Sequence, residues 1–112
     1  MKKIEAIVRS AKVNDVCRAL DTVGHPGLML TYIEGHGRQK GIKKVLRGKE
    51  YCVEFMTKTK IDLIVKDGDA EKTIEAIRKA AFTGEIGDGK IFISTMDDAM
   101  RIRTAERGDA AV

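Results

Sequence analysis

Tryptophan is absent from the sequence, and aromatic residues as a whole make up 4% of the 112 residues. Sheet proteins that bind single-stranded RNA commonly stack the bases on aromatic side chains, so this composition disfavours an RNA-binding module. The two histidines, His25 and His36, lie in predicted turn or loop segments without an evident carboxylate or serine partner. They therefore form no catalytic constellation.

Cysteine is equally scarce. Cys17 and Cys52 lie far apart in the chain, form no Cys-x-x-Cys motif and have no histidine at metal-ligand spacing. The sequence therefore predicts neither a disulfide framework nor a zinc site. Cys17 falls on an apolar helical face and is interpreted as a small core residue, and Cys52 is interpreted as structural rather than reactive.

Long apolar runs are also missing. No segment approaches the ~20 residues of a membrane span, and the N-terminal MKKIEAIVRS has no apolar signal-peptide core. We expect a soluble, cytoplasmic protein. One proline and no Ser/Gly-rich linker indicate a single domain over residues 1–112. The net charge of +4 suits an acidic small ligand as well as nucleic acid.

The hydrophobic periodicity switches between strand and helix patterns. Strands are predicted over residues 3–9, 28–34, 57–66 and 90–95, with a short fifth over 100–104. One helix runs from Val13 to the stop signal at Gly24, and a second starts at the 67–69 turn, which offers an aspartate N-cap, and stops at Thr83. The order β-α-β-loop-β-α-β is typical of the α+β ferredoxin-like βαββαβ sandwich.

An internal repeat supports this order, because KIEAIVR at residues 3–9 and KIDLIVK at residues 60–66 match in sign and polarity. Alternate strand residues face opposite sides of a sheet. The side predicted to face the helices carries Ile4, Ala6, Val8, Ile61, Leu63 and Val65. The open side carries Lys3, Glu5, Ile7, Arg9, Lys60, Asp62, Ile64 and Lys66. The repeated Ile7 and Ile64 favour a subunit interface, although the charges also fit a solvated face.

A loop of roughly twenty residues is predicted between the second and third strands, from residue 35 to residue 55. It begins with Gly35, Gly37 and Gly41, interleaved with His36, Arg38, Gln39 and Lys40. Glycines let backbone N–H groups approach phosphate oxygens, and Arg and Lys supply charge. The segment is interpreted either as an anion cradle or as a solvated hairpin tip.

A second glycine-rich loop, Thr83 to Lys90, contains the pattern G-x-x-x-x-G-K. It is not a complete P-loop, because Ile91 stands where a Ser or Thr would bind Mg²⁺. The context is also reversed, since a predicted helix precedes this loop and a strand follows it. A phosphate-contacting loop without hydrolytic machinery and an ordinary glycine-rich turn both fit the pattern.

Two pairs of cations stand two residues apart, Arg101 with Arg103 and Lys58 with Lys60. On an extended segment each pair projects from one face. Paired guanidinium groups bind phosphate oxygens bidentately. Together with the glycine loops, these pairs indicate one anionic nucleotide held by elements distant in sequence.

At these residues the chain closely resembles the PII nitrogen-regulatory signal-transduction proteins, almost from end to end. The most specific blocks are GRQKG at 37–41, RGKEY at 47–51, TGEIGDGKIF at 83–92 and RIRT at 101–104. The resemblance implies a ferredoxin-like homotrimer with ATP or ADP in the clefts between subunits. It also implies a target-docking T-loop over 37–55, a B-loop over 82–90 and a C-terminal segment over 101–112.

The resemblance carries residue roles over by position. Nucleotide contacts are implied for Gly37, Arg38, Gln39, Gly87, Asp88, Gly89, Lys90, Arg101 and Arg103. Gln39 and Lys58 would hold 2-oxoglutarate, with Mg²⁺ coordinated by Gln39 and bridged to the ATP phosphates. Tyr51 matches a tyrosine that some members have uridylylated, and Arg47 matches an arginine that some members insert into an ammonium-channel pore.

The chain departs from the family pattern near the expected nucleotide. Met29 stands where many members have Thr, Asp62 where Glu is usual, and Ile64 where Val is usual. These changes alter the expected adenine and ribose contacts, so the preference between ATP and ADP stays open. His36 in place of Phe and Leu46 in place of Tyr leave the target open.

The leading functional hypothesis is a sensor without enzymatic activity. ATP, ADP and 2-oxoglutarate would bias a mobile loop that engages an ammonium channel or a nitrogen-assimilation enzyme, recruiting the cytoplasmic protein to the membrane in the first case. No nucleic-acid partner and no direct membrane insertion are expected. Two alternatives are a weak nucleotide hydrolase and an RNA-binding ferredoxin-like module.

Overall fold

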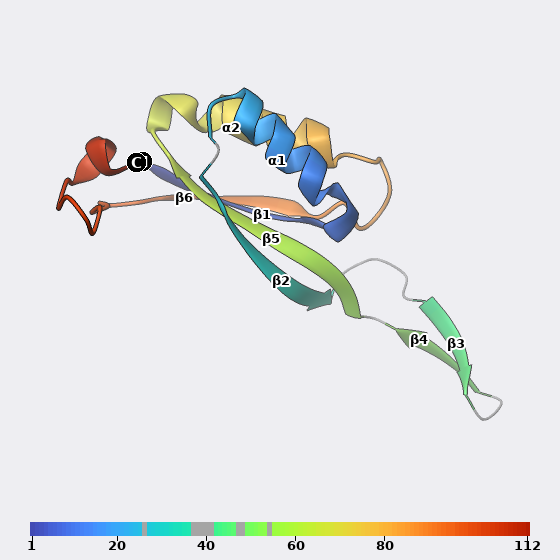
Figure 1. Cartoon of the computed structure of the whole chain (residues 1–112). Coiled ribbons are helices and arrows are strands. Elements are labelled where there is room, and N and C mark those ends of the chain that lie inside the picture. Colours follow the sequence, from blue (N-terminus) through green and yellow to red (C-terminus); the bar gives the residue numbers. More distant parts are fainter. Residues whose placement is uncertain (26, 37–41, 47–48, 54) are drawn as a thin grey trace.

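The computed structural model describes residues 1–25, 27–36, 42–46, 49–53 and 55–112, with side chains described for 1–25, 27–33 and 57–112. The strands are β1 (Lys2–Arg9), β2 (Met29–His36), β3 (Ile42–Leu46), β4 (Lys49–Val53), β5 (Phe55–Val65) and β6 (Lys90–Thr95). The helices are α1 (Val13–Thr22) and α2 (Ala70–Ala81) (Figure 1). Short 3-10 turns cover Ser10–Lys12, Asp67–Asp69 and Gly108–Ala111.

Four strands form an antiparallel sheet in the order β2-β5-β1-β6. Helices α1 and α2 lie side by side on one face of this sheet, and the other face is open (Figure 1). The predicted order of strands and helices is confirmed. Strands β2 and β6 form the two edges, so each presents one unpaired side within the described part of the chain.

The internal repeat becomes a pair of neighbouring strands. In the β1–β5 register, Ile4 lies opposite Leu63 and Ala6 opposite Ile61. The six apolar residues predicted to face the helices are all buried, and α2 adds Thr73, Ile77 and Ala81 to the core. On β1 the residues of the open side stay half-buried, whereas on β5 the open-side residues Lys58 and Asp62 are also buried, at 9% and 7% exposed.

The start of α2 differs from the expected aspartate N-cap. Asp69 has helical backbone angles (φ −98°, ψ −8°) because the preceding 3-10 turn leads directly into the helix, and its side chain makes no capping bond. Thr73 Oγ1 instead donates to the Asp69 carbonyl at 2.7 Å. The carboxylate of Asp67 pairs with the N-terminal ammonium at 2.9 Å, which ties the beginning of β1 to the end of β5.

The segment between β2 and β5 contains more regular structure than a loop. Strand β2 continues to His36, which pairs with Phe55, and β3 pairs with β4 as an antiparallel hairpin. Figure 1 shows this hairpin beyond the ends of β2 and β5. Strand pairing satisfies backbone N–H and C=O groups that an irregular loop leaves to water. The glycine-rich residues 37–41, for which an anion cradle and a hairpin tip are both predicted alternatives, lie outside the described residues.

The predicted strand over 100–104 is wrong. The N–H of Ala105 donates to the Arg101 carbonyl at 2.8 Å, and Ala105 has a left-handed backbone (φ 60°). The chain therefore reverses, and Met100 pairs with Arg107 in an isolated bridge. Arg101 and Arg103 consequently lie on a turn and not on one face of a strand.

Replacing Ile77 with Ala tests the packing of α2 on the sheet. Ile77 is fully buried, so its truncation leaves a cavity and should lower the free energy of unfolding by about 2–4 kcal/mol. Chemical denaturation at fixed protein concentration measures the loss. The exposed Lys79 on the same helix is the control, since Lys79→Ala should change stability by less than about 0.5 kcal/mol. Equal midpoints for both variants would contradict the described packing.

Candidate anion-binding site

The loop over residues 82–90 joins α2 to β6 at one end of the sheet (Figure 1). Its backbone passes very close to β1: a Cβ on Gly89, which has φ +100°, would lie 1.7 Å from the carbonyl oxygen of Ile7. Only glycine fits there without displacement of the backbone. Gly84 and Gly87 also have positive φ, 86° and 107°. Alternating backbone handedness of this kind turns N–H groups toward a common concavity that suits anions.

Asp88 connects the two ends of this loop. Its Oδ2 accepts hydrogen bonds from the N–H groups of Thr83 (2.8 Å) and Gly84 (2.9 Å). Its Oδ1 accepts from the Thr83 hydroxyl and from Arg9 Nε, the latter at 3.2 Å. These bonds stabilise the carboxylate, the Thr83 hydroxyl most, and hold the pKa of Asp88 well below its usual range.

Two cations approach the same loop from the open face of the sheet. Arg9 on β1 lies opposite Lys58 on β5 in the strand register. Lys58 Nζ donates to the Gly87 carbonyl, and an Arg9 terminal nitrogen donates to the Ile86 carbonyl at 2.9 Å. Burial, followed by the charge of Arg9, lowers the pKa of Lys58, and Asp88 opposes that shift. An anion placed here would offset both the burial of the Lys58 ammonium and its repulsion by Arg9.

A cavity of about 400 Å³ borders the loop. Its lining combines apolar and charged residues: Ile7, Val8, Ile77, Arg78, Ala81, Phe82, Asp88, Gly89, Lys90 and Ile91. Among the described residues, no acceptor pairs with the N–H groups of Gly87, Asp88 or Gly89. The combination of available N–H groups and the Lys90 ammonium is suited to a phosphate chain.

A second cavity, of about 270 Å³, lies by the opposite edge of the sheet. It is lined by Gly27, Leu28, Met29, Asp62, Leu63, Ile64, Ala99, Ala111 and Val112. Asp62 is 7% exposed, and its Oδ1 is buried without a hydrogen-bond partner in the described part of the chain. Lys60 Nζ lies 3.8 Å from the other oxygen. An unpaired buried carboxylate oxygen is costly, so a hydrogen-bond donor placed in this cavity would satisfy Asp62 Oδ1.

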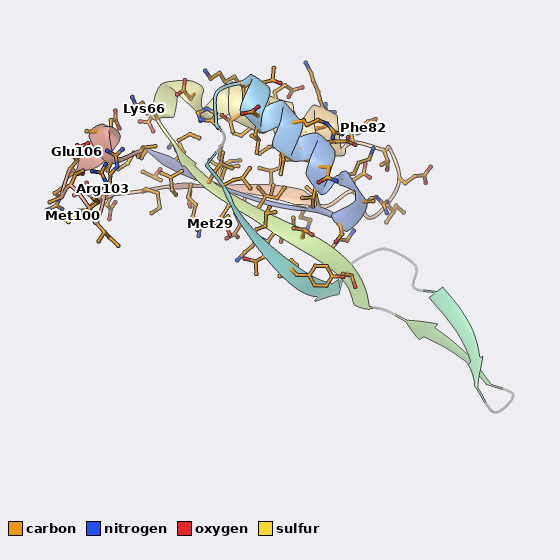
Figure 2. All side chains as sticks on the ribbon, in the orientation of Figure 1. Met29, Lys66, Phe82, Met100, Arg103 and Glu106 are labelled. Carbon is orange, nitrogen blue, oxygen red and sulfur yellow. The ribbon has the colours of Figure 1, made fainter. Side chains whose placement is uncertain are left out.

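The predicted nucleotide residues that the structure describes fall into two groups, one in the loop over 82–90 and one in the C-terminal segment. Lys90 begins β6, and Arg101 and Arg103 follow its other end, beyond a strand of about 17 Å. Figure 2 shows Arg103 beside Met100 and Glu106, at the end of the molecule away from Phe82. The fold of the single chain therefore does not bring Lys90 and the two arginines together.

Arg101 already has partners within its own segment. Its guanidinium donates to Glu106 Oε2 at 2.9 Å and to the Ala110 carbonyl at 3.2 Å. Nearby, Arg107 pairs with Asp98. These bonds fold the C-terminal segment onto itself beside the second cavity, and they occupy the Arg101 guanidinium with Glu106 and the Ala110 carbonyl.

Several predicted site residues lie outside the described residues. These are Gly37, Arg38, Gln39 and Arg47. The backbone of Tyr51 belongs to β4 and pairs with Lys44, while its side chain is outside the description.

Conversely, sequence reasoning gave no role to Arg9 or Thr83, the two side chains that bind Asp88. The repeat contained a signal for Arg9, because antiparallel pairing of the strands that carry its two copies places Arg9 opposite Lys58, two residues before the second copy.

A family model described as nitrogen regulatory protein P-II matches residues 1–106. The chain belongs to this family. It is 50% identical over 112 residues to nitrogen regulatory protein P-II of Rhodospirillum rubrum, with all of both chains covered. It is 47% identical to P-II protein 2 of Methanothermobacter thermautotrophicus, covering 100% of this chain and 97% of that one.

A solved structure supports the same assignment. The crystal structure of Arabidopsis thaliana PII bound to citrate superposes with a TM-score of 0.81 at 37% identity, covering 99% of this chain and 91% of that chain. The sequence-based recognition is thus confirmed, and the PII chain has a role in nitrogen signal transduction. No helix among the described residues is long and apolar enough to cross a membrane.

Replacing Gly89 with Ala tests the close approach of the loop to β1. The added Cβ would collide with the Ile7 carbonyl at a backbone conformation that L-residues avoid, so unfolding should become easier by about 1–3 kcal/mol. Gly68→Ala is the matched control, because nothing lies within 4 Å of its Cβ position. Thermal and denaturant unfolding of both variants provide the comparison, and a Gly89 variant as stable as the control would contradict the geometry.

Proposed function

We propose that this PII chain is a sensor without enzymatic activity that binds ATP or ADP together with 2-oxoglutarate and controls a nitrogen-metabolism target. The observation that carries the proposal is the loop over 82–90. Its Gly87 and Gly89 N–H groups have no acceptor among the described residues, and Lys90 lines the adjoining cavity. Backbone donors together with an ammonium group match the chemistry of a polyphosphate.

In this proposal, two protomers complete each nucleotide site. The loop and Lys90 lie at the β6 edge, whereas Asp62 and Met29 line the cavity at the β2 edge. A head-to-tail contact between unlike edges places the second cavity, with Arg101 and Arg103, against the loop of the next copy. Heterologous contacts generate closed rings where the rotation between copies closes and open filaments where it does not, and we propose a closed homotrimer.

The exposed apolar residues support association along both edges. Met29 is 61% exposed and Tyr32 72% exposed on β2, while Phe92 and Ile93 on β6 are each 49% exposed. Apolar side chains concentrated on unpaired strand edges are typical of interaction surfaces. Their burial between copies would supply the association energy that the ring requires.

The second cavity is proposed to hold the nucleoside. The orphaned Oδ1 of Asp62 would accept a hydrogen bond from an amino or hydroxyl group of the ligand. Met29 and Ile64, which also line this cavity, offer apolar surface to the base. These three residues are the departures from the family pattern that lie near the expected nucleotide, so we propose that nucleotide preference depends on them.

The dicarboxylate is proposed to bind between Lys58 and Gln39. Arg9 places a second cation opposite Lys58, which suits a doubly charged ligand. The structurally similar Arabidopsis PII was crystallised with citrate, which supports a carboxylate-bearing effector. Within the described residues no group of three or more metal-ligating side chains occurs. Mg²⁺ would therefore take most of its oxygens from the phosphates and the dicarboxylate, with Gln39 as the protein ligand.

The output of the sensor is proposed to be the segment over 37–55. A ligand shifts the conformation of this segment only if it binds one conformation more tightly than another. Gln39 and Lys58 flank the segment in sequence, so a dicarboxylate between them would provide that difference. Arg47 would contact an ammonium channel at the membrane, and Tyr51 would be the site of modification.

A weak nucleotide hydrolase is the second candidate. The G-x-x-x-x-G-K pattern at 84–90 favours nucleotide binding, but Ile91 follows Lys90 and the loop leads from α2 into β6. The hydroxyl for Mg²⁺ and the helix N-terminus of a P-loop are therefore both missing from this segment. Turnover of ATP far above background would favour the hydrolase.

Calorimetry with ATP-Mg²⁺ and 2-oxoglutarate tests the proposed coupling. The dicarboxylate should bind more tightly when ATP-Mg²⁺ is present, because the metal connects the two ligands. Lys58→Met should weaken 2-oxoglutarate by about 10- to 100-fold, as expected for one charged hydrogen bond. Lys66→Met, at an exposed position beyond the other end of β5, is the control. Equal dicarboxylate affinity with and without ATP-Mg²⁺ would contradict the coupling.

Mixing two inactive variants tests whether subunits share the nucleotide site. Lys90→Ala and Arg103→Ala chains should each bind ATP poorly, because each lacks a charge at every site. Co-refolded mixtures should regain one intact site per mixed trimer, where an unaltered Lys90 meets an unaltered Arg103. Calorimetric stoichiometry reports the recovered sites, with separately refolded variants as the reference. A mixture no better than its components would contradict a shared site.

A further inference from the structure

Asp88 is an unexpected residue in a loop that is proposed to receive phosphate, because its negative charge repels an anion. The structure shows that both of its carboxylate oxygens face donors of the protein. Thr83 and Gly84 supply two backbone N–H groups, the Thr83 hydroxyl supplies a third donor, and Arg9 Nε supplies a fourth. A carboxylate with four donors has little capacity left for a ligand.

These contacts close the loop on itself. Thr83 is the second residue of the loop over 82–90 and Asp88 lies five positions later, so their bonds form a ring of six residues. The Thr83 hydroxyl oxygen also accepts the N–H of Glu85 at 3.2 Å, which turns the chain toward the tip. One threonine side chain thereby organises the first half of the loop, while its backbone N–H contacts the carboxylate.

Arg9 attaches the closed loop to the sheet. It contacts Asp88 Oδ1 through Nε at 3.2 Å and the Ile86 carbonyl through a terminal nitrogen at 2.9 Å. Arg9 is the last residue of β1, which is a central strand of the sheet. The guanidinium fork therefore connects the loop to rigid structure at two points, and it compensates the charge of the carboxylate.

The clamp formed by Arg9, Thr83 and Asp88 leaves the backbone donors of the loop available. It engages the N–H groups of residues 83, 84 and 85, while those of Gly87, Asp88 and Gly89 have no acceptor in the described part of the chain. The first half of the loop is thus held internally, and the second half presents its donors. Holding donors in place before a ligand arrives lowers the entropic cost of binding.

We propose that Arg9, Thr83 and Asp88 are positioning residues that fix the loop in its phosphate-receiving conformation, and that the Asp88 carboxylate itself does not contact the phosphates. This assignment rests on the proposed nucleotide-binding function. In this assignment Asp88 would contact the ligand only through its backbone N–H. Thr83 and Arg9 would affect ATP affinity without contacting ATP.

Paired substitutions of Thr83, measured by calorimetry with ATP, test the clamp. Thr83→Val keeps the shape of the side chain but removes the hydroxyl, so ATP should bind about tenfold more weakly, as for the loss of one charged hydrogen bond. Thr83→Ser keeps the hydroxyl and should bind as the wild type does. Thr95→Val is the control, because Thr95 bonds only Lys2 among the described residues, at the other end of β6.

Hydrogen exchange of the ligand-free protein provides a readout without nucleotide. In Asp88→Ala the amides of residues 83 and 84 lose their acceptor, so their exchange should accelerate while that of core amides in β1 stays unchanged. ATP affinity equal to wild type in Thr83→Val, or unchanged exchange at residues 83 and 84 in Asp88→Ala, would overturn the clamp. Failure of the wild-type chain to bind ATP would overturn the proposed function together with the clamp. If the wild type binds ATP and only the variant results differ from those expected, the clamp alone is overturned.

Discussion

The antiparallel pairing of β1 with β5 determines where the other functional groups lie. Because the two strands are copies of one pattern, their pairing buries one apolar side under both helices and leaves both charged sides on the open face. It also sets Arg9 beside Lys58 at one end of the sheet. Two like charges at neighbouring positions repel each other. The carbonyl groups of residues 86 and 87 and the Asp88 carboxylate offset that repulsion.

The loop over 82–90 therefore has two dependencies. Its backbone fits against β1 only because Gly89 lacks a side chain, and its charge is balanced only because Arg9 and Lys58 lie beneath it. Of these two cations, Lys58 is the proposed partner of the dicarboxylate, while Arg9 is engaged by Asp88 and the Ile86 carbonyl. A dicarboxylate that engaged Lys58 would compete with the Gly87 carbonyl, so the contacts of the phosphate loop and of the dicarboxylate site are connected within one chain.

Periodicity predicted those parts of the structure in which burial repeats along the chain. The core faces of β1 and β5 followed from alternate apolar residues, since the side of the sheet that a strand residue faces is set by its position along the strand. The turn at Arg101 was missed because two arginines separated by one residue are compatible with a strand and with a turn. What decided between them was the Ala105 bond to the Arg101 carbonyl, which the spacing does not encode.

The same reasoning limited what was predicted of the candidate site. Lys58 and Lys90 were identified from charge and motif. In the structure Lys58 contacts the loop at the Gly87 carbonyl, and Lys90, the last loop residue, lines the adjoining cavity. The partners of Asp88 were not identified, because Arg9 lies 79 residues away and the Thr83 hydroxyl acts only once the loop closes.

The split of the proposed nucleotide residues between two sheet edges has a thermodynamic consequence. A ligand that binds only where two protomers meet stabilises their association by mass action. In the proposed trimer, nucleotide binding and subunit association are therefore linked: each favours the other.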